Sequence, residues 1–288
     1  MHVFITGATG WVGSAVVEEL IGAGHQVTGL ARSDDKATSL AATGARVRRG
    51  TLDHTGVLRD AAAEADAVIH TAFNHDFAKF AENAEQDRRT IELLGSALEG
   101  SDRPLIVTSG LLGLARGATE RDAPPASSPR QSEVAARAVA ARGVRAATVR
   151  LASSVHGPGD HGFIPMLIGA AREKGVSAYL GDGENRWSGV YRRDAARVFR
   201  LALEHGVTEP AYHAVADEGI PFRTIAEVIG RRLGLPVESR PAEHFGWFAI
   251  MVRAEFSVSS ERTREVLGWE PSGPALLADI ERDEYYGD

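Results

Sequence analysis

Short apolar runs alternate with longer amphipathic stretches through the first half of the chain. The apolar runs predict strands at residues 3–5, 26–31, 46–48, 67–70, 105–108 and 147–150, and the amphipathic stretches predict helices at 11–21, 87–98 and 131–142. Beyond residue 151 the pattern is less regular, with helices predicted at 163–173, 194–204, 222–233 and 260–267. Strands that alternate with helices are typical of β-α-β units, so we expect an α/β fold with a doubly wound parallel sheet of the Rossmann type.

Glycines follow the first predicted strand at a spacing of three, in the run Thr6-Gly7-Ala8-Thr9-Gly10-Trp11-Val12-Gly13. The first glycine permits a tight turn, the second lets the backbone approach a pyrophosphate, and the third lets the next helix pack close to the sheet. The N-terminus of that helix presents free N–H groups to the phosphates. Such a turn can also be purely structural, but strand, turn and helix in this order predict a dinucleotide site that includes Gly7, Thr9, Gly10, Trp11 and Val12.

The end of the second predicted strand bears on the choice of dinucleotide. In this fold it meets the adenine ribose, where an acidic residue favours NAD. Arg32 and Ser33 stand there instead, and the guanidinium fork of an arginine suits a 2′-phosphate. Asp34 and Asp35 follow directly, which keeps NAD as an alternative, and Arg32 could also be an ordinary solvated charge. The sequence favours NADP, bound here by Arg32 and Ser33.

Composition narrows the class of protein. The 288 residues contain no cysteine, which excludes disulfides, thiolate catalysis and cysteine-ligated metals. A net charge of −7 gives no reason to expect nucleic acid or an anionic membrane as a partner. No apolar run reaches membrane-spanning length and no signal peptide fits before residue 3, so we expect a cytoplasmic monomer or homodimer that binds a small-molecule substrate.

The chain shows no repeat and no flexible linker. We therefore expect a single unit over residues 1–288, in which 1–155 form mainly the dinucleotide-binding core and 156–288 mainly a small C-terminal substrate lobe. No His-x-x-x-His or Asp-x-Asp-x-Asp pattern occurs, and we predict no metal site.

Further segments match a known family in the same order along the chain. They are Val68-Ile69-His70-Thr71-Ala72, Val107-Thr108-Ser109-Gly110, Val149-Arg150-Leu151, Val155-His156-Gly157-Pro158-Gly159, Val190-Tyr191 with Asp194, and Leu267-Gly268-Trp269-Glu270-Pro271. With the glycine turn, they make the whole chain resemble the extended and atypical short-chain dehydrogenase/reductases, which include nucleotide-sugar epimerases and 3β-hydroxysteroid dehydrogenase-like proteins. The resemblance implies that Thr51 and Leu52 flank the adenine. It also implies that Thr71, Ala72 and Phe73 run beside the nicotinamide ribose and that Leu151 borders the nicotinamide.

The catalytic pair of that family is missing. The family usually carries Tyr-x-x-x-Lys, in which the lysine lowers the tyrosine pKa and the phenol exchanges a proton with the substrate oxygen. Counting back from Gly143 and Arg150 puts these two positions at Pro125 and Pro129, and no tyrosine in the chain has a lysine four residues later. Standard chemistry with that pair is therefore excluded.

Three residues are candidates to replace the pair. His75 follows the fourth predicted strand within the polar run Asn74-His75-Asp76, although this run could simply cap the next helix. Ser109, at the end of the fifth strand, matches the region where the family holds a substrate oxygen, or it could bond into the following turn. Tyr191 lies in a segment that returns toward the active site in the family, or it could be a core tyrosine. His156 and His161 could also line the pocket.

The leading functional expectation is an NADP-dependent oxidoreductase, of the ketone or imine reductase or alcohol dehydrogenase type. Its substrate is expected to be small to medium and fairly apolar. One alternative is a non-catalytic NAD(P)-binding sensor or regulator. An epimerase or isomerase is the other, and it is disfavoured because transient oxidation also depends on a strong base near the substrate.

Overall fold

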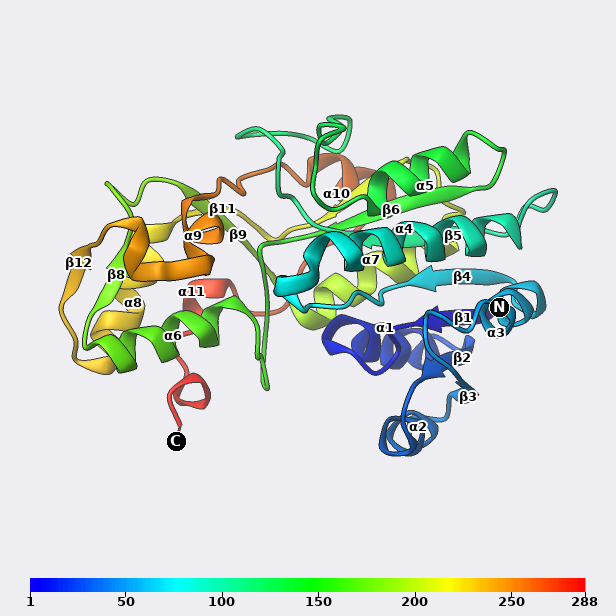
Figure 1. The fold of residues 1–288 in the computed structure, drawn as a ribbon, viewed down its shortest axis with the longest axis horizontal. Coiled ribbons are helices and arrows are strands. Elements are labelled where there is room, and N and C mark those ends of the chain that lie inside the picture. The colour runs from blue at the N-terminus through cyan, green and yellow to red at the C-terminus, as the bar shows by residue number, and fades with distance from the viewer. Residues whose placement is uncertain (288) are drawn as a thin grey trace.

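The computed structural model describes residues 1–287, without the side chain of Phe77. A seven-stranded parallel sheet forms its centre, in the order β10-β6-β5-β4-β1-β2-β3 (Figure 1). The order reverses at β1, because β2 and β3 lie on one side of it and β4, β5 and β6 on the other. In such doubly wound sheets ligands bind at the carboxyl edge, near the reversal. The strands are β1 (His2–Thr6), β2 (Gln26–Ala31), β3 (Arg46–Arg49), β4 (Ala67–His70), β5 (Leu105–Ser109), β6 (Ala146–Leu151) and β10 (Ala211–Ala214).

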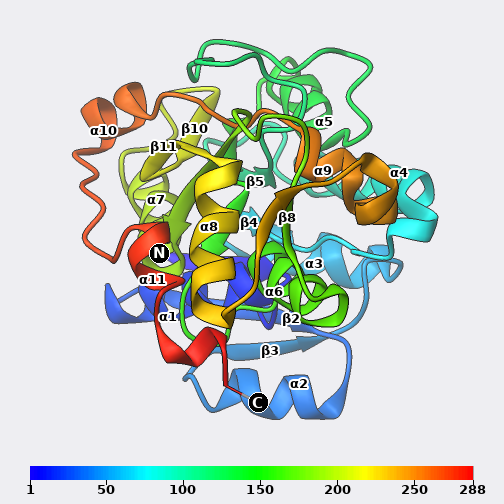
Figure 2. The same cartoon turned by 90° about the vertical axis from the view of Figure 1, so that its left-hand side faces the viewer.

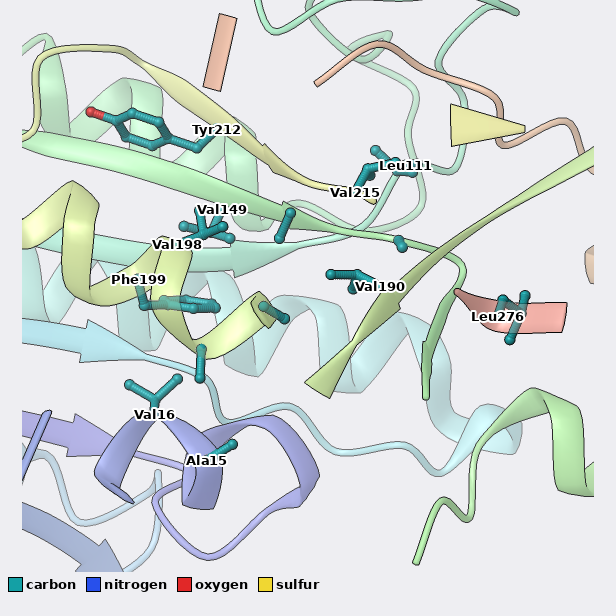
Figure 3. Packing of buried hydrophobic residues seen from close by; sticks show 14 of the residues in the cluster. Ala15, Val16, Leu111, Val149, Val190, Val198, Phe199, Tyr212, Val215 and Leu276 are labelled. Atoms are coloured by element: carbon teal, nitrogen blue, oxygen red, sulfur yellow. The ribbon is translucent and has the colours of Figure 1, made fainter. Parts of the chain in front are cut away.

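Successive side chains of β1 enter two different cores, one on each face of the sheet. Val3 and Ile5 join the core that includes α1 and α7, and Phe4 joins the core that includes α3, α4 and α5. Figure 3 shows the first core, where side chains of α1, α7, β6 and β10 pack together. The flanking helices are α1 (Trp11–Gly22), α2 (Asp34–Ala41), α3 (Thr55–Glu64), α4 (Phe80–Ser96), α5 (Ser132–Ala140) and α7 (Arg192–Glu204).

A smaller lobe is built mainly from the C-terminal half around a buried aromatic cluster. Trp187 is fully buried and packs against Phe163, Phe222, Phe248 and Phe256. Figure 2 shows α6, α8 and β8 of this lobe side by side. Its elements are β7 (Ser154–His156), α6 (Phe163–Lys174), β8 (Ser177–Tyr179), β9 (Arg186–Tyr191), β11 (Asp217–Pro221), α8 (Phe222–Leu233), β12 (Val237–Ser239), η2 (Ala242–Phe248), α9 (Ala249–Arg253), α11 (Leu276–Asp279) and η3 (Asp283–Tyr285). The helix α10 (Glu261–Leu267) packs instead on β10 and α7.

The predicted α/β fold of the Rossmann type is confirmed. All six predicted strands are present with bounds that agree to within one residue, but β10 was not predicted. Residues 192–214 of the C-terminal half thus return to the central sheet, because α7 packs on α1 and β10 pairs with β6. The helix predicted at 87–98 begins at Phe80, because its first two turns carry too few apolar residues to show a period. No helix within residues 1–287 is long and apolar enough to cross a membrane.

Candidate active site

The glycine turn packs tightly against the segment that follows β4. Gly7 has a φ of +70°, and a Cβ there would lie 2.6 Å from the backbone nitrogen of Ala72. A Cβ on Gly13 would lie 2.1 Å from the Gly7 carbonyl oxygen, so both positions require glycine. Gly10 is the N-cap of α1 and no side chain caps this helix, which leaves its first N–H groups for a ligand. Two further residues of the predicted site, Thr9 and Val12, are half-buried in the same turn.

Trp11 connects this turn to the second lobe. Its indole Nε1 donates to the Val155 carbonyl at 2.7 Å, and the edge of its ring meets His161 with 5.4 Å between centroids. The Arg192 guanidinium stacks on the indole at 4.3 Å and donates to the Trp11 carbonyl and the Ser14 hydroxyl. The position of the turn is therefore fixed from both lobes.

The carboxyl end of β2 presents an unpaired cation. Arg32 is exposed and forms no hydrogen bond or ion pair within the described chain. Ser33 caps α2 by accepting from the N–H of Lys36 at 3.4 Å. The carboxylate of Asp34 pairs with Arg49 at 2.8 Å, so its charge is partly balanced by the end of β3. Thr51 and Leu52 follow β3 at the same edge of the sheet.

An arginine joins the ends of β4 and β5. Arg130 stacks over the ring of Phe73 at 4.3 Å and donates from Nη2 to the Thr108 carbonyl at 3.1 Å. The same Phe73 ring meets His75 edge-on at 5.2 Å between centroids. Beside them the Thr71 hydroxyl donates to the Thr6 carbonyl at 2.8 Å and ties the end of β4 to β1. Sequence reasoning missed Arg130, although it directly follows Pro129, the place of the absent lysine.

Arg130 is held by a chain of buried hydrogen bonds. Its Nε donates to Ser132 Oγ at 2.8 Å, and the Ser132 hydroxyl donates to Asp87 Oδ2. On the other side of the carboxylate, His70 Nε2 donates to Asp87 Oδ1 at 3.0 Å, and the Thr6 hydroxyl donates to His70 Nδ1 at 2.6 Å. Burial pushes the pKa of Asp87 upward, but the His70 hydrogen bond and the neighbouring charges hold it below its usual value overall. The buried carboxylate of Asp87 is therefore linked to Arg130 through the hydroxyl of Ser132.

His75 stands at the rim of this cluster. Its neighbours shape the turn, because Asn74 accepts from the backbone N–H of Asp76 and Asp76 in turn caps the short helix η1 (Phe77–Lys79). Although the imidazole is reachable by solvent, surrounding protein atoms lower the pKa of His75, and the charges of Arg130 and His161 lower it further. A neutral imidazole near Arg130 can accept a proton at neutral pH.

The other two proton-handling candidates lie in different surroundings. Ser109 is 7% exposed, and its hydroxyl has no hydrogen-bond partner among residues 1–287. Tyr191 is half-buried and packs against Gly157 and Gly273, with its ring 6.0 Å from that of His156. The structure thus places His75 near Arg130 after β4, and Ser109 follows the Thr108 carbonyl that Arg130 binds at the end of β5. Tyr191 lies in a packing contact between loops. Leu151, the remaining predicted cofactor residue, is half-buried at the end of β6.

His156 belongs to a separate buried cluster. Its Nδ1 lies 2.9 Å from Asp279 Oδ2, and the Tyr285 hydroxyl donates to the same oxygen at 3.0 Å. Tyr285 also accepts from the backbone N–H of Gly157. These contacts attach the C-terminal residues to the loop after β7 and account for His156 structurally.

An apolar pocket lies in the C-terminal lobe between α6, β8, α8 and η2. Its walls include Leu167, Phe222, Ile229, Phe245 and Phe248. Such a pocket suits an apolar ligand group rather than a charged one.

Comparisons with known proteins agree with this fold and with binding of an NAD(P)-type cofactor. The model of the family described as NAD(P)H-binding matches residues 7–162, and the model of the NAD dependent epimerase/dehydratase family matches 126–215. An uncharacterized protein of Schizosaccharomyces pombe is 44% identical over 99% of this chain and 100% of its own, and one of Saccharomyces cerevisiae is 44% identical over 97% and 98%. In structure, the chain resembles the dTDP-glucose 4,6-dehydratase DesIV of Streptomyces venezuelae, solved with NAD bound, with a TM-score of 0.77, 20% identity and coverage of 99% and 97%.

The chain belongs to the NAD(P)H-binding family, and the match of residues 126–215 to the epimerase/dehydratase family supports the expected resemblance to atypical short-chain dehydrogenase/reductases. Proteins similar to all or part of this chain include an NAD-bound dehydratase and two reductases, and one matching family is described as NAD dependent epimerases and dehydratases, which supports an enzyme.

Proposed function

We propose that this protein is an NADP-dependent oxidoreductase that interconverts a ketone or imine with the corresponding alcohol or amine. The observation that carries the proposal is the Ser109 hydroxyl, which has no hydrogen-bond partner in the described chain and follows directly on Thr108, whose carbonyl accepts from Arg130. Both lie at the carboxyl edge of the sheet, as does the glycine turn. The substrate is proposed to be small to medium and fairly apolar; the apolar pocket of the second lobe has no lining residue in common with this cluster.

The residues present fit a dinucleotide. The uncapped N-terminus of α1 suits the pyrophosphate, and the unpaired Arg32 suits a 2′-phosphate at the end of β2. Bound NADP would accept the hydride in oxidation or, as NADPH, supply it in reduction. Ser109 would hold the substrate oxygen by a hydrogen bond, and His75 would handle the proton, with Tyr191 as the remaining alternative.

The lowered pKa of His75 sets the expected pH dependence. In alcohol oxidation the neutral imidazole accepts the proton, so the rate should rise with pH as His75 loses its proton. In carbonyl reduction the protonated form donates, so the rate should fall over the same interval, below the ordinary histidine pKa of about 6.5.

Cofactor choice is tested by measuring NADPH and NADH affinities for Arg32→Ala. A charge-assisted contact is worth about 1.5–3 kcal/mol, so NADPH should bind roughly ten- to a hundredfold more weakly while NADH binding changes little. Lys36→Ala, which removes an equally exposed charge in α2, is the control and should leave the preference intact. Equal losses for both cofactors would make Arg32 a structural residue.

Catalysis is tested on a substrate found by screening carbonyls and imines with NADPH. Among His75→Ala, Ser109→Ala and Tyr191→Phe, at least one should lose about 10²–10⁴-fold in turnover with NADPH affinity preserved. Near-normal turnover in all three would refute the assignment of proton handling. Binding of NADPH with no consumption by any substrate would favour the sensor, and a configuration change without net consumption would favour the epimerase.

A further inference from the structure

Arg130 has more hydrogen-bond donors than the protein satisfies. A guanidinium carries five N–H donors, and the bonds of Arg130 engage Nε with Ser132 and Nη2 with the Thr108 carbonyl. Within residues 1–287, Nη1 has no hydrogen-bond partner and no carboxylate lies within ion-pair distance. A half-buried cation without a direct anion is unfavourable unless a ligand supplies the missing charge.

The free donors of Arg130 lie where a substrate oxygen is expected. Arg130 is fixed between Phe73, just after β4, and Thr108, near the end of β5. The next residue of β5 is Ser109, whose hydroxyl also lacks a partner in the described chain. Both the Ser109 hydroxyl and the free donors of Arg130 thus lie at the carboxyl ends of the adjacent parallel strands β4 and β5, the edge at which ligands bind in these sheets.

We infer that Arg130, together with Ser109, binds the reacting oxygen of the substrate and stabilises the negative charge that develops on it. Arg130 is then a catalytic residue that supplies a fixed positive charge in a chain that lacks the Tyr-x-x-x-Lys pair. The inference rests on the proposed function, because the oxygen becomes anionic only if a carbonyl is reduced or an alcohol oxidised there.

The step balances without a proton from Arg130. In reduction, the carbonyl carbon gains the hydride supplied by NADPH, and the π electron pair of the C=O bond moves to the oxygen. The resulting alkoxide lies against the guanidinium and then takes a proton from protonated His75 or from water. A preorganised donor is most effective in a site of low polarity, where no solvent has to reorient.

The buried network gives Arg130 its orientation. Ser132 accepts from Arg130 Nε and donates to Asp87, so one edge of the guanidinium is fixed while Nη1 stays free. Asp87 balances part of the charge without contacting Arg130 directly, because Ser132 stands between them. Ser132 and Asp87 are therefore positioning residues.

The first test uses the cofactor-loaded protein and acetate, a small anion that mimics the charged oxygen. Acetate binding to the NADP-saturated protein is measured by calorimetry. Arg130→Met should weaken it about ten- to a hundredfold, with NADP affinity changed by less than about threefold. The control is Arg103→Lys, since Arg103 donates only to carbonyls and a serine hydroxyl at the opposite edge of the sheet. No acetate binding by the wild type, or equal binding by Arg130→Met, would overturn the inference.

The second test measures turnover of a carbonyl substrate. Loss of one oxyanion donor typically costs about 10²–10³-fold in kcat, so Arg130→Met should lose that much in kcat with a smaller change in KM. Guanidinium salts should restore part of the activity of Arg130→Met but not of His75→Ala, and Arg130→Lys should retain an intermediate rate. Normal kcat in Arg130→Met would refute the role of Arg130 and leave the proposed oxidoreductase intact. Arg130-dependent acetate binding without any turnover by the wild type would instead refute the oxidoreductase and leave an anion site.

Discussion

Two arginines near the first turn of α5 differ in how completely the protein pairs them. Arg150 is fully buried and makes a two-oxygen ion pair with Glu133, at 2.6 and 2.8 Å. It also donates to His213 Nε2 at 2.8 Å and to the carbonyls of Thr119 and Asp122. All the partners of Arg150 are protein groups, so its role is to hold α5, β6 and the loop at 119–122 together.

Arg130 contacts Ser132, the residue before Glu133 in α5, and only some of its donors have partners. Ser132 links it to the network of Asp87, whereas the adjacent Glu133 serves Arg150. Arg150 therefore binds the carboxylate of Glu133 directly. Arg130 is linked to the carboxylate of Asp87 only through the Ser132 hydroxyl, and some of its donors have no partner in the described chain. A buried charge whose partners are complete indicates structure, and one whose partners are incomplete at a sheet edge indicates a ligand.

The largest expected effect is loss of stability in Arg150→Met. Removing one partner of a buried ion pair typically costs about 3–5 kcal/mol, because the other charge stays buried. Arg137 also contacts Glu133, at 3.0 Å, so we expect a loss near 3 kcal/mol in the free energy of unfolding by urea. The double variant Arg150→Met with Glu133→Leu is the control and should recover much of it. A loss below about 1 kcal/mol in the single variant would show that the pair is not structural.

The next effect is a dependence of stability on pH through His213. Its Nε2 accepts from Arg150 and its Nδ1 donates to the Ser259 carbonyl at 2.6 Å, an arrangement that only the neutral ring can form. Burial and then the Arg150 charge lower the pKa of His213. The unfolded chain therefore binds the proton first as pH falls below about 6.5, and stability is lost by at most about 1.4 kcal/mol per pH unit.

The measurement is the free energy of unfolding from pH 7.5 downward. Because His75 and His244 also have lowered pKa values, the test is the difference between the wild type and His213→Gln. The variant should show a shallower slope, while His205→Gln at an exposed helix end should follow the wild type. Parallel curves for wild type and His213→Gln would contradict the neutral state of His213.

The same contrast explains how far the sequence could predict the molecule. Apolar runs and glycine spacing are local signals, so the strands of the cofactor core and the turn at Gly7 could be predicted directly. The strand β10, Ala-Tyr-His-Ala, has no continuous apolar run, and it is buried because it pairs with β6 and packs against α7 and α10.

Polar contacts between residues that are far apart in the sequence could not be predicted from local sequence patterns. Ser132 and Asp87 are 45 residues apart, and nothing near Asp87 in sequence predicts a link to Arg130. The absence of Tyr-x-x-x-Lys directs attention to the segment that contains Arg130, since Arg130 is the basic residue nearest to Pro129. Looking for a cation adjacent to the lost lysine would have named it, but its free donors become evident only in three dimensions.

The smallest expected effect, and the one that most sharpens the comparison, is the stability of Arg130→Met. The substitution removes two hydrogen bonds but also a half-buried cation without a direct anion, and Ser132 still donates to Asp87. The two contributions oppose each other, so the free energy of unfolding should change by less than about 1 kcal/mol. The measurement is urea unfolding beside Arg150→Met. If Arg130→Met loses as much stability as Arg150→Met, both arginines are structural, and any loss of activity would reflect damage to the fold rather than an empty place beside the substrate oxygen.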